Sequence, residues 1–137
     1  MSTRSNIAIR ESDGTMEVIY CHFDGYVEGG VGEQLLNHYD DETKVRNLIK
    51  LGGISSLEDT IEDTAEKAYT KRGEELEIMH FDNDTQYAER MKDDIWIEYI
   101  YVYDVESQRW LMMTPIGHIP PIYAVLSEYL AIEKEEA

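Results

Sequence analysis

A glycine-rich turn between an apolar segment and a helical segment places the strongest constraint on how this chain can fold. The stretch Tyr20–Gly32 reads YCHFDGYVEGGVG and ends in a cluster of glycines. The run Glu17–Phe23 has apolar residues on both of its alternating faces, which predicts a strand inside a sheet. Apolar residues then recur at helical spacing over Val31–His38. The chain must therefore pass from a buried strand into a helix through this turn.

The segment before the turn predicts a β-hairpin. Asn6–Arg10 and Glu17–Phe23 read as strands, and Ser12–Thr15 between them contains Asp-Gly. Asp-Gly between two strand-like runs favours a tight reversal. Alternation divides the second run into two faces: Val18, Tyr20 and His22 on one, and Ile19, Cys21 and Phe23 on the other.

Two segments after the turn have helical patterns. Asp41 can cap a helix with an apolar stripe from Val45 to Ile49, and Gly52-Gly53 would end it. The acidic segment from Ser55 to Tyr69 leaves two alternatives. It forms a helix with a carboxylate face, or it is a mobile loop because like charges four residues apart repel.

The second half of the chain predicts further strands and helices. Proline is favoured at a helix start because its missing N–H is not needed there. The expected elements are a strand over Glu75–Phe81, a short helix capped by Asp84, strands over Ile95–Tyr103 and Arg109–Thr114, a helix that begins at Pro120-Pro121, and a charged tail over Glu133–Ala137. This order predicts a single α+β domain over residues 1–137, with a mostly antiparallel sheet of about four to five strands covered by helices.

Charge restricts the classes of partner. The chain has 29 acidic and 12 basic residues, for a net charge of −17 at pH 7. Such a surface repels nucleic-acid phosphates and anionic membranes, and it suits a protein partner with a basic surface. No apolar run is long enough for a signal peptide or a membrane span. A single cysteine excludes an internal disulfide and a multi-cysteine zinc site. We therefore expect a cytoplasmic protein with no direct nucleic-acid binding, no membrane association, and no metal or cofactor.

The tripeptide His-Phe-Asp occurs twice, at the expected ends of two strands. If those ends lie side by side, they could form a ligand site or an acid/base pair. The candidate residues are His22, Asp24, Tyr26, His80 and Asp82. The alternative is ordinary turn chemistry, since histidine and aspartate are common where strands end, and Asp24-Gly25 is a typical turn pair.

Two other interpretations of the turn have less support. A helix that begins near Val31 could bind an anion, but GGVG lacks the lysine of a phosphate-binding loop and does not match GxGxxG. Cys21 could act as a nucleophile with His22 or His38 as its base. A buried structural cysteine is the favoured alternative on a predicted strand.

Acidic and tyrosine-rich segments offer candidate interaction surfaces. The expected strand over Ile95–Tyr103 places Ile97, Tyr99, Tyr101 and Tyr103 on one face, either as core or as an interface of a homo-oligomer. The acidic run is a solvated face or a contact for a basic protein. Its candidate partner-binding residues are Glu58, Asp59, Glu62, Asp63 and Glu66.

The first two-fifths of the chain resemble a family of small proteins encoded by phages, prophages and bacteria. The resemblance lies in TRSNIAI, the following DG, IYCHFDGYVEGGVGEQLLNHYDD and KVRNLIKLGGISSL. This chain has Val27 where the family pattern often has proline, and one extra glycine at Gly29-Gly30. The resemblance implies an origin in a phage or mobile element and supplies no catalytic residues.

These observations favour an accessory role, in which this acidic protein binds a host protein, over an enzymatic role, and they leave the question of enzymatic activity open. The more specific hypothesis is that the protein counters host defence by imitating nucleic acid, with carboxylates in place of phosphates. The alternative is a protein that binds or processes a small ligand or nucleotide at the turn from His22 to Asp24.

Overall fold

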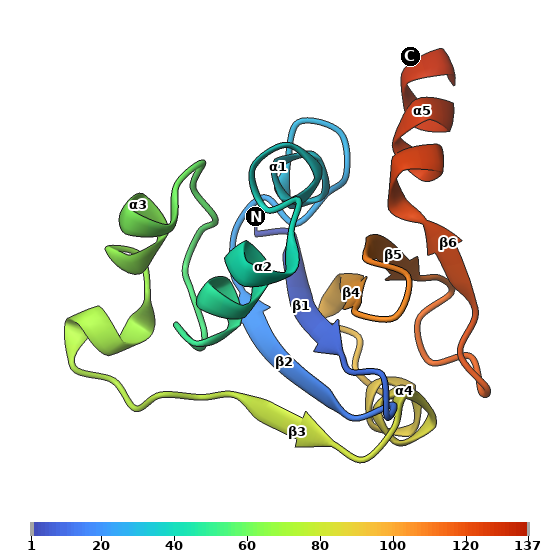
Figure 1. The fold of residues 1–137 in the computed structure, drawn as a ribbon, viewed down its shortest axis with the longest axis horizontal. Helices are drawn as coiled ribbons and strands as arrows, with labels where there is room; N and C mark the ends of the chain where they lie inside the picture. Colours follow the sequence, from blue (N-terminus) through green and yellow to red (C-terminus); the bar gives the residue numbers. More distant parts are fainter. Residues whose placement is uncertain (1, 137) are drawn as a thin grey trace.

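The computed structural model describes residues 2–136 and contains a six-stranded sheet with the order β3-β2-β1-β4-β5-β6 (Figure 1). Strands β1 and β4 pair in parallel, and the other neighbouring strands are antiparallel. The elements are β1 (Arg4–Arg10), β2 (Met16–Cys21), α1 (Val31–His38), α2 (Glu42–Ile49), α3 (Ile61–Ala65), the 3-10 helix η1 (Tyr69–Arg72), β3 (Met79–Phe81), α4 (Asp84–Met91), β4 (Ile97–Asp104), β5 (Arg109–Met113), β6 (Tyr123–Val125) and α5 (Leu126–Glu136). The predicted α+β class is confirmed, with more strands than the four to five expected.

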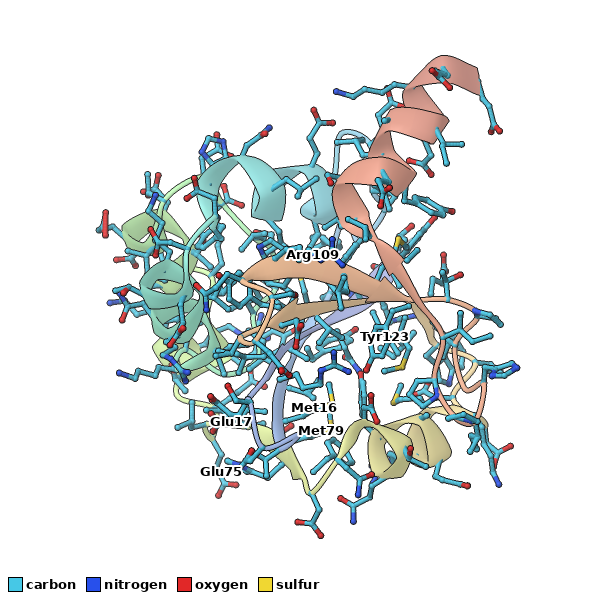
Figure 2. The ribbon with its side chains drawn as sticks, turned by 45° about the vertical axis from the view of Figure 1, so that its right-hand side comes forward. Met16, Glu17, Glu75, Met79, Arg109 and Tyr123 are labelled. Atoms are coloured by element: carbon cyan, nitrogen blue, oxygen red, sulfur yellow. The ribbon has the colours of Figure 1, made fainter. Side chains whose placement is uncertain are left out.

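Both faces of the central strands are buried. On one face, Ile7 and Ile9 of β1 and Tyr101 of β4 belong to a core that includes residues of α1, α2 and α5. On the other face, Ala8 and Val102 belong to a smaller core that includes residues of α4. Figure 2 shows Met16, Met79 and Tyr123 on this α4 side of the sheet. Helices on both faces explain why the first hairpin is apolar on both sides.

The first half of the chain follows its local sequence patterns. Strands β1 and β2 form the expected hairpin, and Gly14 in its turn has a φ of 93°, which favours glycine. Helix α1 has the predicted bounds. Helix α2 is capped by Asp41, whose Oδ1 accepts a hydrogen bond of 2.8 Å from the Lys44 amide.

The tyrosine face differs from the prediction at one position. Ile97 belongs to the α4-side core, whereas Tyr101 and Tyr103 belong to the opposite core. The register of β1 and β4 shifts here, because Arg4 pairs with Ile97 while Ser5 pairs with Tyr99. This irregularity shifts the alternation by one residue. Tyr101 and Tyr103 are at most 1% exposed and are therefore core residues.

The strands β1, β2, β4 and β5 differ from their predicted bounds by one or two residues at an end, and β3 and α4 differ in how they begin. Strand β3 is only Met79–Phe81, rather than the whole of Glu75–Phe81. Helix α4 is capped by Asn83, whose Oδ1 accepts a hydrogen bond of 2.8 Å from the Gln86 amide, so Asp84 is its first helical residue instead of its cap.

The end of the chain departs most from the prediction. Residues 123–125 form β6 against β5, and α5 begins only at Leu126, so the expected helix start at Pro120-Pro121 is wrong. The expected charged tail is helical through Glu136. Two contacts hold it against the α1 region: Glu133 Oε1 accepts a hydrogen bond from the Glu28 amide, and Lys134 Nζ lies 3.0 Å from Glu33 Oε2. Within residues 2–136, no helix is long and apolar enough to cross a bilayer.

An ionic network at the ends of the central strands joins the sheet to α4. Arg10 lies 2.9 Å from Asp84 and 3.2 Å from Asp104, and Tyr123 donates a hydrogen bond of 2.8 Å to Asp84. Burial alone would raise the pKa of Asp104. Hydrogen bonds from Ser107 and the charge of Arg10 outweigh burial and lower this pKa below its ordinary value.

We expect Asp104→Asn to lower the free energy of unfolding at neutral pH by about 1–3 kcal/mol, because Arg10 loses a carboxylate partner. A carboxyl group whose pKa is lowered on folding stabilises the fold when the pH is above its ordinary pKa. This stabilisation is lost as the pH falls through the folded-state pKa. The difference in the free energy of unfolding between the native protein and Asp104→Asn should therefore shrink below about pH 4. Urea unfolding at neutral pH and at about pH 3 measures both effects. If the difference is the same at both pH values, the ionised Asp104 carboxylate is not what stabilises the fold here.

Candidate functional site

The turn after β2 is anchored on both of its sides. The Gly25 amide donates to Thr3 O at 2.9 Å, and the buried Tyr101 hydroxyl donates to Gly25 O at 2.6 Å. A side chain at position 25 would meet Thr3 O at 2.8 Å and Ser5 Cβ at 2.9 Å, so only glycine fits. Tyr101 stands in the central strand β4. The glycine-rich turn within Tyr20–Gly32, called the signature turn below, is therefore fixed directly to the middle of the sheet.

The N-terminus of α1 has no free backbone donors in its first turn. The amides of Val31, Gly32 and Glu33 donate to the carbonyl oxygens of residues 24, 26 and 27, at 2.8, 3.2 and 2.9 Å. The Gln34 amide then bonds to Gly30 O at 3.1 Å. An anion at this helix end would have to displace these bonds. This geometry agrees with the sequence argument against a phosphate-binding loop.

His22 lies against the start of the chain and against β2. Its Nδ1 is 2.6 Å from Tyr20 Oη, and its Nε2 is 3.0 Å from Ser2 Oγ. The Phe23 ring packs edge-on against the imidazole at 4.6 Å. Both ring nitrogens of this candidate thus already have protein partners.

Asp24 and Tyr26 form a local pair at the surface. Asp24 has a φ of 58°, and Tyr26 Oη donates to its Oδ1 at 3.0 Å. The hydrogen bond and the charge of Asp24 raise the pKa of Tyr26 above its ordinary value. This contact is typical of a polar turn and brings no third functional group to the carboxylate.

The two His-Phe-Asp segments lie at opposite ends of β2. His80 pairs across the sheet with Glu17 and lies 3.6 Å from its carboxylate. His22 follows Glu17 by five residues, a separation of roughly 16 Å along a strand. Asp82 is exposed, and its amide bonds to Gln86. Over residues 2–136, no group of three or more His, Cys, Asp and Glu side chains could hold a metal ion. The structure therefore does not bring these candidates together.

Cys21 is a buried thiol. It is 0% exposed, and its Sγ donates to Phe23 O at 3.6 Å. Burial raises the pKa of this thiol to about 12, so the nucleophilic thiolate is scarce at neutral pH. The structural interpretation of Cys21 fits these values better than the nucleophilic one.

The acidic segment forms neither of the two expected structures. Only Ile61–Ala65 is helical, so its acidic residues do not form one continuous carboxylate face. The buried Thr64 fixes the segment to the core: its Oγ1 accepts a hydrogen bond of 2.9 Å from the Glu58 amide and lies 2.9 Å from Tyr39 Oη. The segment is a fixed loop with one short helix. Asp59, Glu62, Asp63 and Glu66 are exposed, and Glu58 is half-buried.

A hollow of about 380 Å³ joins the acidic segment to the signature turn. Its lining includes Asp24 from the turn, Glu33 from α1, and Glu58 and Asp59 from the acidic segment. His38 Nε2 lies 3.5 Å from Asp59 Oδ1 at the same place. The sequence predicts Asp24 as a ligand-site residue and Glu58 and Asp59 as partner-binding residues, whereas Glu33 is in neither group. Glu33 is already paired with Lys134, so Asp24, Glu58 and Asp59 are the acids that could receive a cationic side chain.

A second hollow of about 380 Å³ lies beside Tyr20 of β2 and Met79 of β3, on the α4 side of the sheet. Arg4, Tyr20, Arg90 and Trp96 are among its lining residues, and its apolar lining is supplied by Met79, Met91 and Ile97. No feature of the sequence indicates this cavity. Its residues come from four separate stretches of the chain, and their spacing forms no motif.

Comparison of the chain with known protein families, characterised proteins and solved structures finds no match. The geometry of these surfaces must therefore carry the functional argument.

We expect Tyr101→Phe to lower the free energy of unfolding by about 1–3 kcal/mol, because the buried Gly25 carbonyl loses its donor. Tyr26→Phe is the matched control. It removes a hydroxyl whose hydrogen bond lies at the surface, so it should change stability much less than Tyr101→Phe does. Urea unfolding of the two variants measures the difference. Equal effects would show that the anchor contributes nothing particular to the fold.

Proposed function

We propose that this protein is an accessory protein of a phage or prophage and that it acts by binding a host protein with a basic surface. The observation that carries the proposal is the acidic hollow, which combines Asp24, Glu58 and Asp59 in a chain of net charge −17. The N-terminal resemblance supports the origin. The acidic hollow and the surrounding charge support the class of partner.

The acidic surface formed by Glu58, Asp59, Glu62, Asp63 and Glu66 is the proposed contact. Its backbone is held by Thr64 and Tyr39, so the carboxylates need little further ordering when a partner binds. A lysine or arginine of the partner would enter the hollow between α1 and this surface. The anti-defence version adds that the partner normally binds DNA, whose phosphates these carboxylates replace.

The alternative function, ligand binding or processing around His22–Asp24, has less support. The α1 amides that could hold a phosphate already bond to the turn, and both His22 nitrogens have protein partners. His80 and Asp82 are too distant to complete such a site.

Affinity capture from bacterial lysate tests the proposal. A variant in which the five residues of the acidic surface are replaced by Gln or Asn should lose the captured protein. The control replaces Glu89, Glu106, Glu128, Glu135 and Glu136, five exposed acids elsewhere, by Gln and should retain it. Both variants lose the same charge, so a difference between them identifies the surface.

Adding salt or duplex DNA to the capture experiment tests two further features of the contact, its ionic character and the mimicry of DNA. Capture should weaken as salt shortens the Debye length below about 10 Å, since the contact is ionic. Duplex DNA should displace the protein from its partner if the mimicry version is right. The absence of any salt-sensitive partner, or equal loss by both variants, would refute the proposed contact. A partner that DNA does not displace would refute mimicry alone.

A further inference from the structure

The cavity lined by Arg4, Tyr20, Arg90 and Trp96 concentrates positive charge on an acidic protein. Among the residues that the structure describes, no carboxylate lies within 4.0 Å of either guanidinium. By contrast, Arg10, Arg46 and Arg72 are all paired with carboxylates.

Asp94 is the one acid in the lining, and it has a structural task. Its Oδ1 accepts hydrogen bonds of 2.8 Å from the Trp96 amide and 3.3 Å from the Ile97 amide. This carboxylate holds the entry into β4. Even with Asp94 counted, two arginines give the cavity a local positive charge, which suits an anionic group on a ligand.

The cavity also has aromatic walls. Trp96 is 63% exposed, and the Arg4 guanidinium lies 5.2 Å from the centre of its ring. Tyr20 is half-buried on the β2 side. Exposed aromatic faces next to arginine are well suited to stacking on a planar ring. Met79, Met91 and Ile97 supply the apolar contact that such a ring requires.

Asn6 adds a polar contact that nothing in the described chain completes. Its side chain lines the cavity and the residue is only 2% exposed. Its Nδ2 donates to Tyr87 Oη at 2.8 Å, whereas its Oδ1 accepts no hydrogen bond from residues 2–136. Ser5 Oγ is the one buried side-chain oxygen or nitrogen without a partner in residues 2–136, so Asn6 Oδ1 is an accessible acceptor rather than a buried one. A ligand N–H or O–H group could donate to Asn6 Oδ1.

We propose that this cavity binds a small planar aromatic anion that carries a hydrogen-bond donor. Arg4 and Arg90 hold the anionic group, Trp96 and Tyr20 contact the ring, and Asn6 Oδ1 accepts from the donor. The volume of about 380 Å³ is within the usual range for small-molecule sites. Nucleoside monophosphates and aromatic hydroxycarboxylates both have this chemistry. The inference is independent of the proposed binding of a host protein, which uses the acidic surface.

Trp96 provides the readout for a binding experiment. The other tryptophan, Trp110, is 3% exposed and donates to Tyr39 O, so it should not respond to a ligand in this cavity. Four probes separate the requirements: adenosine 5′-monophosphate, 4-hydroxyphenylacetate, uncharged adenosine and inorganic phosphate. We expect at least one aromatic anion to change Trp96 emission with a dissociation constant below about 1 mM. Adenosine and phosphate should bind at least about tenfold more weakly, because adenosine lacks the anionic group and phosphate lacks the aromatic ring.

Arginine variants test the assigned contacts. Arg4→Gln and Arg90→Gln should each weaken binding by about tenfold or more, since each removes a charged partner of the anion. Arg109→Gln is the control: Arg109 is exposed on β5, and Figure 2 shows it well apart from Met79 of the cavity. Trp96→Phe should remove the fluorescence change. The circular dichroism spectra of all variants should match that of the native protein.

The two aromatic anions distinguish the sources of the ligand. Tighter binding of adenosine 5′-monophosphate assigns the site to nucleotides, and tighter binding of 4-hydroxyphenylacetate assigns it to aromatic acids. The proposal is overturned if neither anion binds, if uncharged adenosine binds as tightly as the tighter of the two anions, or if Arg109→Gln weakens binding as much as Arg4→Gln. Failure here leaves the capture experiment on the acidic surface unaffected, so the two proposals can fail separately.

Discussion

A buried hydrogen bond from the Tyr101 hydroxyl to the Gly25 carbonyl connects the centre of the sheet to the turn on which the N-terminal half depends. Tyr101 is in β4, which pairs in parallel with β1, and Gly25 also bonds to Thr3 just before β1. The turn then supplies the carbonyl groups that receive the first amides of α1. One contact thus relates the start of the chain, the signature turn, the first helix and a strand from the distant second half.

This arrangement changes how the signature turn should be interpreted. The glycines, the histidine and the aspartate between Tyr20 and Gly32 resemble the ingredients of an active site. In the structure, their polar groups mostly satisfy one another, and Cys21 is a buried thiol. The turn places Asp24 in the lining of the acidic hollow, which is its contribution to the proposed function. The two candidate surfaces differ in sign: an acidic hollow suited to a basic protein, and an arginine-lined cavity suited to a small anion.

Features that depend on neighbouring residues were predictable from the sequence. The Asp-Gly hairpin, the α1 bounds and the Asp41 cap follow from turn chemistry, helical spacing and a local side-chain bond. Features that depend on pairing across the fold were not. The β6 strand forms because β5 offers a free edge to residues whose spacing also fits a helix. Ile97 changes face because of an irregular register with Arg4.

The same distinction applies to the sites. The separation of His22 from His80 depends on the register of β2 and β3, which the repeated tripeptide does not reveal. The arginine-lined cavity depends on Arg4 and Arg90 meeting from opposite halves of the chain. The acidic residues were visible in the sequence, but their combination with Asp24 needed the tertiary structure.

Amide hydrogen exchange at the start of α1 tests most directly whether the signature turn is an architectural element. If its donors are satisfied as described, the amides of Val31, Gly32 and Glu33 should exchange only through global unfolding, with opening free energies equal to that of the whole protein. The protection of these three amides against exchange should not change when nucleotides or phosphate are added. Exchange at the rate of an unstructured peptide, or protection that appears only with an added anion, would contradict this account and restore the turn as a binding site.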